Sequence, residues 1–160
     1  MTFDPAKHLD DTDWAILDEL QADARLPFSE LGRRVSLSAP ATADRVRRLE
    51  DAGVIRGYQA MIDLKAVGVP IEAVIRARDD KGMLRGSIGE RPEVLDAIHV
   101  TGEDCWIVRV AVPDMETLEA TVGFLGGFGP TTTSLVFSSP IRQAPVSRAV
   151  LGQPEERAAG

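Results

Sequence analysis

Five arginines lie close together in the first third of the chain, and their side chains are the ones best suited to bind a ligand. They are Arg33, Arg34, Arg45, Arg47 and Arg48, and only one acid lies among them. A guanidinium presents several N–H donors in one plane, which suits phosphate. The stretch also holds small residues that let a helix approach base edges, namely Ser38, Ala39, Ala41 and Thr42. The pattern therefore indicates double-stranded DNA as the partner, with arginines on phosphates and small residues at bases.

Two short helices joined by a tight turn are predicted to position these side chains. The first helix is indicated by apolar residues at helical spacing, which are Phe28, Leu31 and Val35. It stops at Ser36, and Ser38 is a good N-cap for a second helix that closes at Gly53. This is the pattern of a helix-turn-helix, whose second helix enters the major groove. A small helical bundle with a solvated basic face is the alternative.

A third helix is predicted ahead of this pair. Asp10 is a suitable N-cap, and the buried stripe is expected to contain Ile16, Leu17, Leu20 and Ala24. Three helices through Asp51 then form one small core. After Gly53 the pattern changes, and alternation over residues 54–62 predicts a strand.

The second half of the chain is predicted to contain both strands and helices. Strands are predicted over residues 71–78, 94–100, 105–112 and 131–138, and helices over 82–90 and 115–125. Residues 141–150 could add a further short strand. The order strand, helix, strand, strand, helix, strand is ferredoxin-like, with both helices on one face of a four-stranded antiparallel sheet. The uncovered face predicts a homodimer.

Charge limits the kind of DNA binding that the chain can perform. The formal net charge is -7, and residues 1–63 hold eight Lys and Arg against twelve Asp and Glu. Such a head cannot coat DNA indiscriminately, so we expect binding at selected sites by a multimer that combines several weak basic faces. The single cysteine excludes an intramolecular disulfide, and the sequence contains neither a secretory signal nor a membrane-length apolar run. We therefore expect a cytoplasmic protein that does not contact membranes.

Two sequence motifs resemble the leucine-responsive/asparagine-responsive (Lrp/AsnC) family of transcription regulators. One is Arg-x-x-Arg-Leu-Glu-x-x-Gly-Val-Ile, residues 45–55, and the other is the Val-Thr-Gly-acid loop of residues 100–104. The resemblance implies an α+β fold, with an N-terminal winged helix-turn-helix head and a C-terminal ferredoxin-like βαββαβ (RAM) domain. It implies a DNA-binding domain over 1–53, a hinge strand and linker over 54–66, an effector-binding and oligomerisation domain over 67–150, and a disordered tail over 151–160.

The resemblance also implies an amino-acid effector, held where dimers assemble into a tetramer or octamer. The loop supplies donors and acceptors for a carboxylate and an ammonium through Val100, Thr101, Gly102, Glu103 and Asp104. Hydroxyls from what is expected to be a neighbouring strand come from Thr132, Thr133 and Ser134. The alternative is a polar turn beside a strand that is rich in threonine only because threonine favours strands. The loop departs from the family pattern in that its aromatic residue falls later, at Trp106.

Other chemistry finds little support in the sequence. His99, Glu103, Asp104 and Cys105 could be drawn as a metal site, but neighbours on a strand point to opposite faces. No nucleophile has a histidine and an acid in a supporting context, so we expect neither an enzyme nor a cofactor. The sequence thus predicts a sequence-specific transcriptional regulator modulated by a small effector. The alternative is a small-molecule-binding or assembly module whose head contacts protein rather than DNA.

Overall fold

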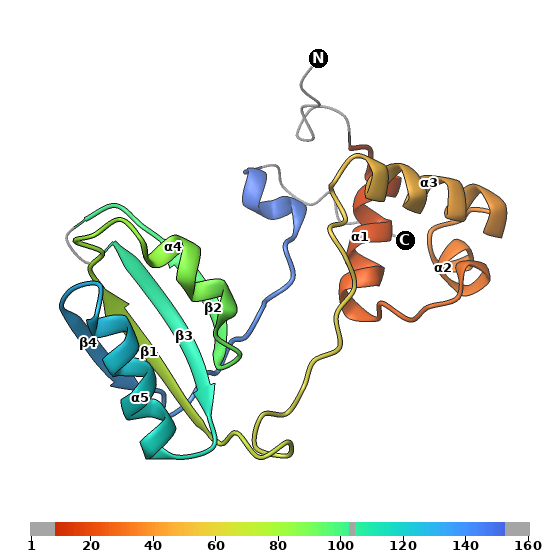
Figure 1. The fold of residues 1–160 in the computed structure, drawn as a ribbon. Coiled ribbons are helices and arrows are strands. Elements are labelled where there is room, and N and C mark those ends of the chain that lie inside the picture. Colours follow the sequence, from red (N-terminus) through yellow and green to blue (C-terminus); the bar gives the residue numbers. More distant parts are fainter. Residues whose placement is uncertain (1–8, 103–104, 153–160) are drawn as a thin grey trace. The chain divides into compact units, whose positions relative to one another are not determined.

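The computed structural model describes residues 9–102 and 105–152, and Figure 1 shows its two compact units. The first unit comprises residues up to Ala60 together with those from Ile141 onward, and the second is Met61–Pro140. No helix in the described ranges is long and apolar enough to cross a membrane.

Three helices form the head in the first unit: α1 (Asp11–Ala22), α2 (Phe28–Arg34) and α3 (Ala39–Asp51). Asp10 caps α1 as predicted, and its side chain accepts a hydrogen bond from the Asp13 N–H at 2.8 Å in a complete capping box. The core of the head buries Ile16, Leu31, Val46 and Leu49. Ala24 was expected in this core but is exposed, because α1 ends two residues earlier.

The end of α3 is closed by Gly53, as the sequence predicts. Gly53 has φ +70°, a left-handed conformation that glycine adopts without strain. The Gly53 N–H donates to the Glu50 carbonyl and the Val54 N–H to the Leu49 carbonyl, each at 2.9 Å, which is the Schellman pattern. Val54 also packs against the head core beside Leu49, which fixes the direction in which the chain leaves the helix.

The strand expected over residues 54–62 is not formed in this chain. Alternation alone does not make a strand, since the backbone also needs a neighbouring strand to bond with. Val54 and Ile55 pack on the head core instead, and the Tyr58 hydroxyl donates to Glu50 of α3 at 2.8 Å. The start of the linker is thus held against the head by side chains, and the head has no β-wing among its described residues.

The second unit has the predicted βαββαβ order. Its strands are β1 (Ile71–Ala77), β2 (Val94–His99), β3 (Trp106–Val112) and β4 (Thr131–Leu135), and they form an antiparallel sheet in the order β2-β3-β1-β4. The first crossover contains α4 (Leu84–Ser87) followed by the 3-10 turn η2 (Ile88–Glu90), and the second contains α5 (Met115–Gly126). Figure 1 shows both helices against one face of the sheet.

Alternation along the strands separates a buried face from an open one. The helix-covered face buries Ala73, Ile75 and Ala77 of β1 against β3 and against Leu84 and Leu118 of the helices. The opposite face carries the residues in between, including Glu72, Val74, Arg76 and Arg109. No described helix packs on it, as expected for a sheet that needs a partner.

The C-terminal segment belongs to the head rather than to the sheet. The strand expected over residues 141–150 is absent from the described chain, which instead forms the 3-10 turn η3 (Arg148–Leu151). The side-chain amide of Gln21 donates to the Val146 carbonyl at 3.0 Å and accepts from the Val146 N–H at 2.7 Å. The Arg148 guanidinium pairs with Asp11 at the start of α1. The expected boundary at residue 150 therefore differs from the division observed, which ends the second unit at Pro140.

Candidate nucleic-acid interface and effector loop

The turn between α2 and α3 is closed by a contact between Gly32 and Thr42. A Cβ atom on Gly32 would lie 2.6 Å from the Leu37 carbonyl oxygen and 2.7 Å from the Thr42 hydroxyl. Only glycine allows the helices to approach this closely. Thr42 is fully buried, and its hydroxyl donates to the Ser38 carbonyl at 2.9 Å. The prediction that Thr42 reaches a base edge is corrected accordingly, because its side chain is committed to the crossing of the two helices.

The exposed residues of α3 are Pro40, Asp44, Arg47, Arg48, Glu50 and Asp51, and all of them except Glu50 form a stripe at helical spacing. The side chain of Ser38, at the exposed start of the helix, caps it by accepting from the Ala41 N–H at 3.4 Å. Pro40 and Asp44 were not among the residues predicted to contact DNA. Their spacing from the buried Val46 and Leu49 was the signal that could have placed them on this surface.

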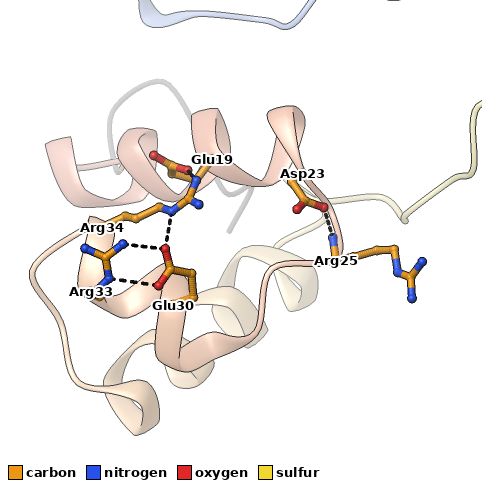
Figure 2. Close-up of polar contacts among 6 residues, drawn as sticks. All are labelled: Glu19, Asp23, Arg25, Glu30, Arg33 and Arg34. Atoms are coloured by element: carbon orange, nitrogen blue, oxygen red, sulfur yellow. Dashed lines mark hydrogen bonds and ion pairs between the residues drawn. The ribbon is translucent and has the colours of Figure 1, made fainter.

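Arg33 and Arg34 are held in a cluster with two glutamates, which Figure 2 shows. Arg33 makes two bonds to Glu30, at 2.7 and 3.0 Å. Arg34 joins Glu30 at 2.9 Å to Glu19 of α1 at 2.7 Å. Hydrogen bonds from Arg33 and then Arg34 lower the pKa of the Glu30 carboxyl from 4.5 to about 2, so it is charged at any physiological pH. The three- and four-residue spacings were the signal in the sequence, since such pairs meet on one helix face.

Arg45 has a different environment from the other arginines. One of its terminal nitrogens bonds to Asp10 at 2.6 Å and to Asp13 at 2.8 Å, which are the two members of the α1 capping box. Burial raises the pKa of the Asp10 carboxyl, but hydrogen bonds from Arg45 and Asp13 outweigh it and leave this pKa below its ordinary value. Arg45 therefore ties α3 to the start of α1, and with 24% of its side chain exposed it is less accessible to DNA than Arg47, of which 68% is exposed.

Arg47 and Arg48 remain available on the outer surface of α3. Arg47 makes a single ion pair with Asp44 at 3.3 Å, and both side chains are about two-thirds exposed or more. Arg48 has no ion-pair partner within residues 9–102 and 105–152. Exposed, weakly paired arginines are free to bind phosphate.

The predicted effector loop joins β2 to β3. The Val100 N–H donates to the Cys105 carbonyl at 2.7 Å and closes the hairpin. Thr101 and Gly102 are exposed, and Gly102 has φ +122°, a conformation that side chains disfavour. Glu103 and Asp104, which were predicted to accept from an ammonium group, lie outside the described residues.

The hydroxyls of β4 are not next to this loop within one chain. β1 and β3 separate β4 from β2, so the expectation of a neighbouring strand is wrong for a single copy. Thr132 and Ser134 lie opposite Arg76 and Val74 on the open face, whereas Thr133 lies opposite Ile75 on the helix-covered face. Side chains that alternate along a strand cannot all point at one ligand. The two halves of the predicted effector site therefore belong to opposite edges of the sheet.

The suggested metal group finds no counterpart in the part of the chain that the structure describes, where no three of His, Cys, Asp and Glu could hold an ion together. That part omits Glu103 and Asp104. The ring of His99 instead packs on Trp106, with centroids 4.8 Å apart.

Comparisons with known proteins agree with both units. The AsnC-type helix-turn-helix domain matches residues 9–50, and the Lrp/AsnC ligand binding domain matches residues 74–146. The chain is 30% identical to the HTH-type transcriptional regulator LrpC of Bacillus subtilis over 133 residues, which are 81% of this chain and 92% of that regulator. It is 42% identical to an HTH-type transcriptional regulator of Mycobacterium tuberculosis over 118 residues, 71% of this chain and 80% of that one.

A solved structure of similar fold carries a bound amino acid. It is a transcriptional regulator from Neisseria meningitidis in complex with L-methionine, with a TM-score of 0.82 and 30% identity over 89% of this chain and 99% of that one. Relatives of this kind are transcriptional regulators rather than enzymes. Sequence, fold and surface together show that this chain belongs to the Lrp/AsnC family of transcriptional regulators.

Proposed function

We propose that this protein regulates transcription by binding selected sites in double-stranded DNA through α3, and that a small effector, an amino acid, modulates its assembly or DNA affinity. The observation that carries the proposal is the surface of α3. Gly32 and Thr42 lock α3 against α2 in a helix-turn-helix, and the outer side of α3 presents Arg47 and Arg48 without strong internal partners. A helix held in this way is suited to the major groove.

The residues of the head divide into two roles in this proposal. Arg47 and Arg48 bind phosphates, which position the protein without reading sequence. Ser38, Ala39 and Ala41, at the start of α3, are short enough to bring the helix against base edges, where an alanine methyl can contact thymine and a serine hydroxyl can bond to several bases.

The effector site in the proposal is shared between copies of the chain. The loop supplies Val100, Thr101, Gly102, Glu103 and Asp104, and a β4 edge supplies Thr132 and Ser134. Within one chain β1 and β3 separate β4 from β2, the strand that leads into the loop, so we assign the two halves of the pocket to different chains. A homodimer formed through the open sheet face, assembling further into a tetramer or octamer, would bring them together. The L-methionine complex of the similar Neisseria meningitidis regulator supports an amino acid as the ligand.

Removing Arg47 and Arg48 tests the DNA-binding part of the proposal. A duplex is first selected from a random library by repeated binding to the wild-type protein. We expect Arg47→Ala and Arg48→Ala each to weaken binding to this duplex and to a random duplex alike, and to reduce the salt slope by about 0.9 per lost phosphate contact. Arg85→Ala, which removes an exposed arginine of α4 in the second unit, is the matched control. Selection of no duplex at all would favour a head that contacts protein.

Thermal denaturation with each of the twenty amino acids tests the effector. A ligand present at 100 times its Kd stabilises the folded protein by about 2.7 kcal/mol, which is a readily measured rise in Tm. We expect at least one amino acid to raise Tm, and Gly102→Val to abolish the rise by straining the loop backbone. Gly89→Val is the control, because its Cβ would meet open space outside the loop. If no amino acid raises Tm in a protein that binds its duplex, the amino-acid effector is excluded.

A further inference from the structure

Several arginines of the head are paired with carboxylates of the head itself. Arg33, Arg34 and Arg45 each make ion pairs of 3.0 Å or less with carboxylates of the same head, and Arg47 makes a longer one. The sequence nevertheless shows five arginines and one acid between residues 33 and 48. The folded head is therefore less basic at this surface than that stretch suggests.

Glu30 is at the centre of this neutralisation, as Figure 2 shows. Its Oε1 accepts from both Arg33 and Arg34, and its Oε2 accepts from Arg33. Glu19 accepts from the remaining side of the Arg34 guanidinium. Two guanidinium groups thus face two carboxylates, and the cluster has no net charge.

The place of the cluster matters, because α2 is the first helix of the helix-turn-helix. In that motif the first helix crosses the phosphate backbone while the second lies in the groove. Arg33 and Arg34 lie in the last turn of α2, with 72% and 40% of their side chains exposed. A phosphate approaching this helix meets arginines whose charge is already paired, because Nε and Nη2 of Arg33 and Nε and Nη1 of Arg34 donate to carboxylates.

The cluster could instead stabilise the head. Its contacts indicate that this contribution to stability is small. Glu30, Arg33 and Arg34 lie close together on the solvent side of α2, and such pairs stabilise a helix only weakly. The bridge to Glu19 is the single link in the cluster that joins two helices. An exposed ion pair is, however, strong enough to compete with phosphate for the same guanidinium, since both use the same N–H donors.

We propose that Glu30, together with Glu19, attenuates the sequence-independent part of DNA binding by occupying Arg33 and Arg34. The inference rests on the proposed function of the head. A single head then binds DNA weakly, and stable binding needs several heads on one site. The carboxylates of Glu30 and Glu19 thus help to set how strongly the protein binds DNA.

Glu30→Gln tests the inference in the full-length protein. Binding to a labelled random duplex is measured by fluorescence anisotropy at several KCl concentrations. We expect the variant to bind about 2- to 5-fold more tightly at low salt, since an exposed ion pair competes only modestly. We also expect the salt slope to steepen by about 0.9 for each arginine that gains a phosphate. Glu119→Gln in α5 makes the same change in net charge far along the chain and should leave the slope unchanged.

Further variants test whether the tighter DNA binding of Glu30→Gln depends on Arg33 and Arg34. Adding Arg33→Gln and Arg34→Gln to Glu30→Gln should remove the gain, since no guanidinium is left to release. Glu19→Gln frees one side of Arg34 and should give a smaller gain in the same direction, which also tests the idea if Glu30→Gln folds poorly. Unchanged binding relative to Glu119→Gln would overturn the inference, and so would weaker binding, which would mean that Glu30 positions the arginines for phosphate. Failure of the wild-type protein to bind any duplex would instead refute the proposed function.

Discussion

Among the described residues, the core of the first unit buries four apolar side chains, whereas that of the second unit buries eleven. The four come from three short helices, and partly buried leucines and valines surround them. The eleven come from β1, β3 and the two helical crossovers and include Ile75, Trp106 and Leu125. Burial of apolar area is the main favourable contribution to folding, so the second unit has the larger share of it.

The head compensates with polar contacts near its surface. Its first helix has a full capping box, α3 is tied to that box by Arg45, and the C-terminal segment is bonded to Gln21. The ionic contacts among these, which are those of Arg45 with Asp10 and Asp13, respond to pH and salt, whereas a buried aliphatic core does so much less. Changes of pH and salt should therefore alter the stability of the DNA-binding unit more than that of the sheet unit.

The largest expected effect is on the core of the second unit. Ile75→Ala should lower the free energy of unfolding of that unit by about 2–5 kcal/mol, because it leaves a cavity under both helices. Hydrogen exchange measured by mass spectrometry separates the amides of β3 from those of α1. Ile16→Ala, the matched change in the head, should accelerate exchange in α1 only. Equal acceleration in both units would show that they unfold as one.

A smaller effect is expected where α2 and α3 cross. Gly32→Ala places a Cβ against the Leu37 carbonyl and the Thr42 hydroxyl, and should destabilise the head by about 1–3 kcal/mol. Gly86→Ala in α4 is the control, since its Cβ meets nothing within 4 Å and alanine favours a helix. Thermal unfolding followed by circular dichroism compares the two. A Gly32→Ala protein as stable as the wild type would mean that the crossing is looser than the structure shows.

The capping box gives a prediction that depends on pH. The folded pKa of Asp10 lies below its ordinary value of 3.8. Its contribution is therefore fully present above pH 3.8 and is lost as the pH falls through the lower, folded value. Asp10→Ala should destabilise the head by about 1 kcal/mol at pH 7, and the difference from the wild type should shrink in acid. A difference that stays constant down to the folded pKa and below would show that the charge of Asp10 has no part in it.

The smallest effect is expected at the C-terminal segment. Gln21→Ala removes two exposed hydrogen bonds to Val146 and should destabilise the head by about 0.5–1 kcal/mol. The Val146 amide should exchange faster, while amides of the sheet are unchanged. Ser29→Ala on the exposed side of α2 serves as a control for an ordinary surface substitution. Unaltered exchange at Val146 would mean that Gln21 does not hold the segment.

The sequence predicted features that depend on neighbouring residues, such as helix ends. It did not predict contacts between residues that are far apart in the chain. Asp10, Ser38 and Gly53 act within one turn of their own helices, so their types alone predicted the helix ends. The ion pair of Arg45 with Asp10 joins residues 35 positions apart, so no local sequence pattern predicts it. Within one chain the order of strands separates Thr132 from the loop at residues 100–102, and the sequence pattern of single strands does not reveal that order.

The return of the C-terminal segment to α1 also determines when the head can be completed during synthesis. Gln21 and its partner Val146 are 125 residues apart in the chain. A ribosome that adds about 5–20 residues per second leaves α1 without this partner for roughly 6–25 s. In that interval the whole sheet unit, residues 61–140, leaves the ribosome. The DNA-binding unit, although made first, is therefore the last of the two to acquire all of its contacts.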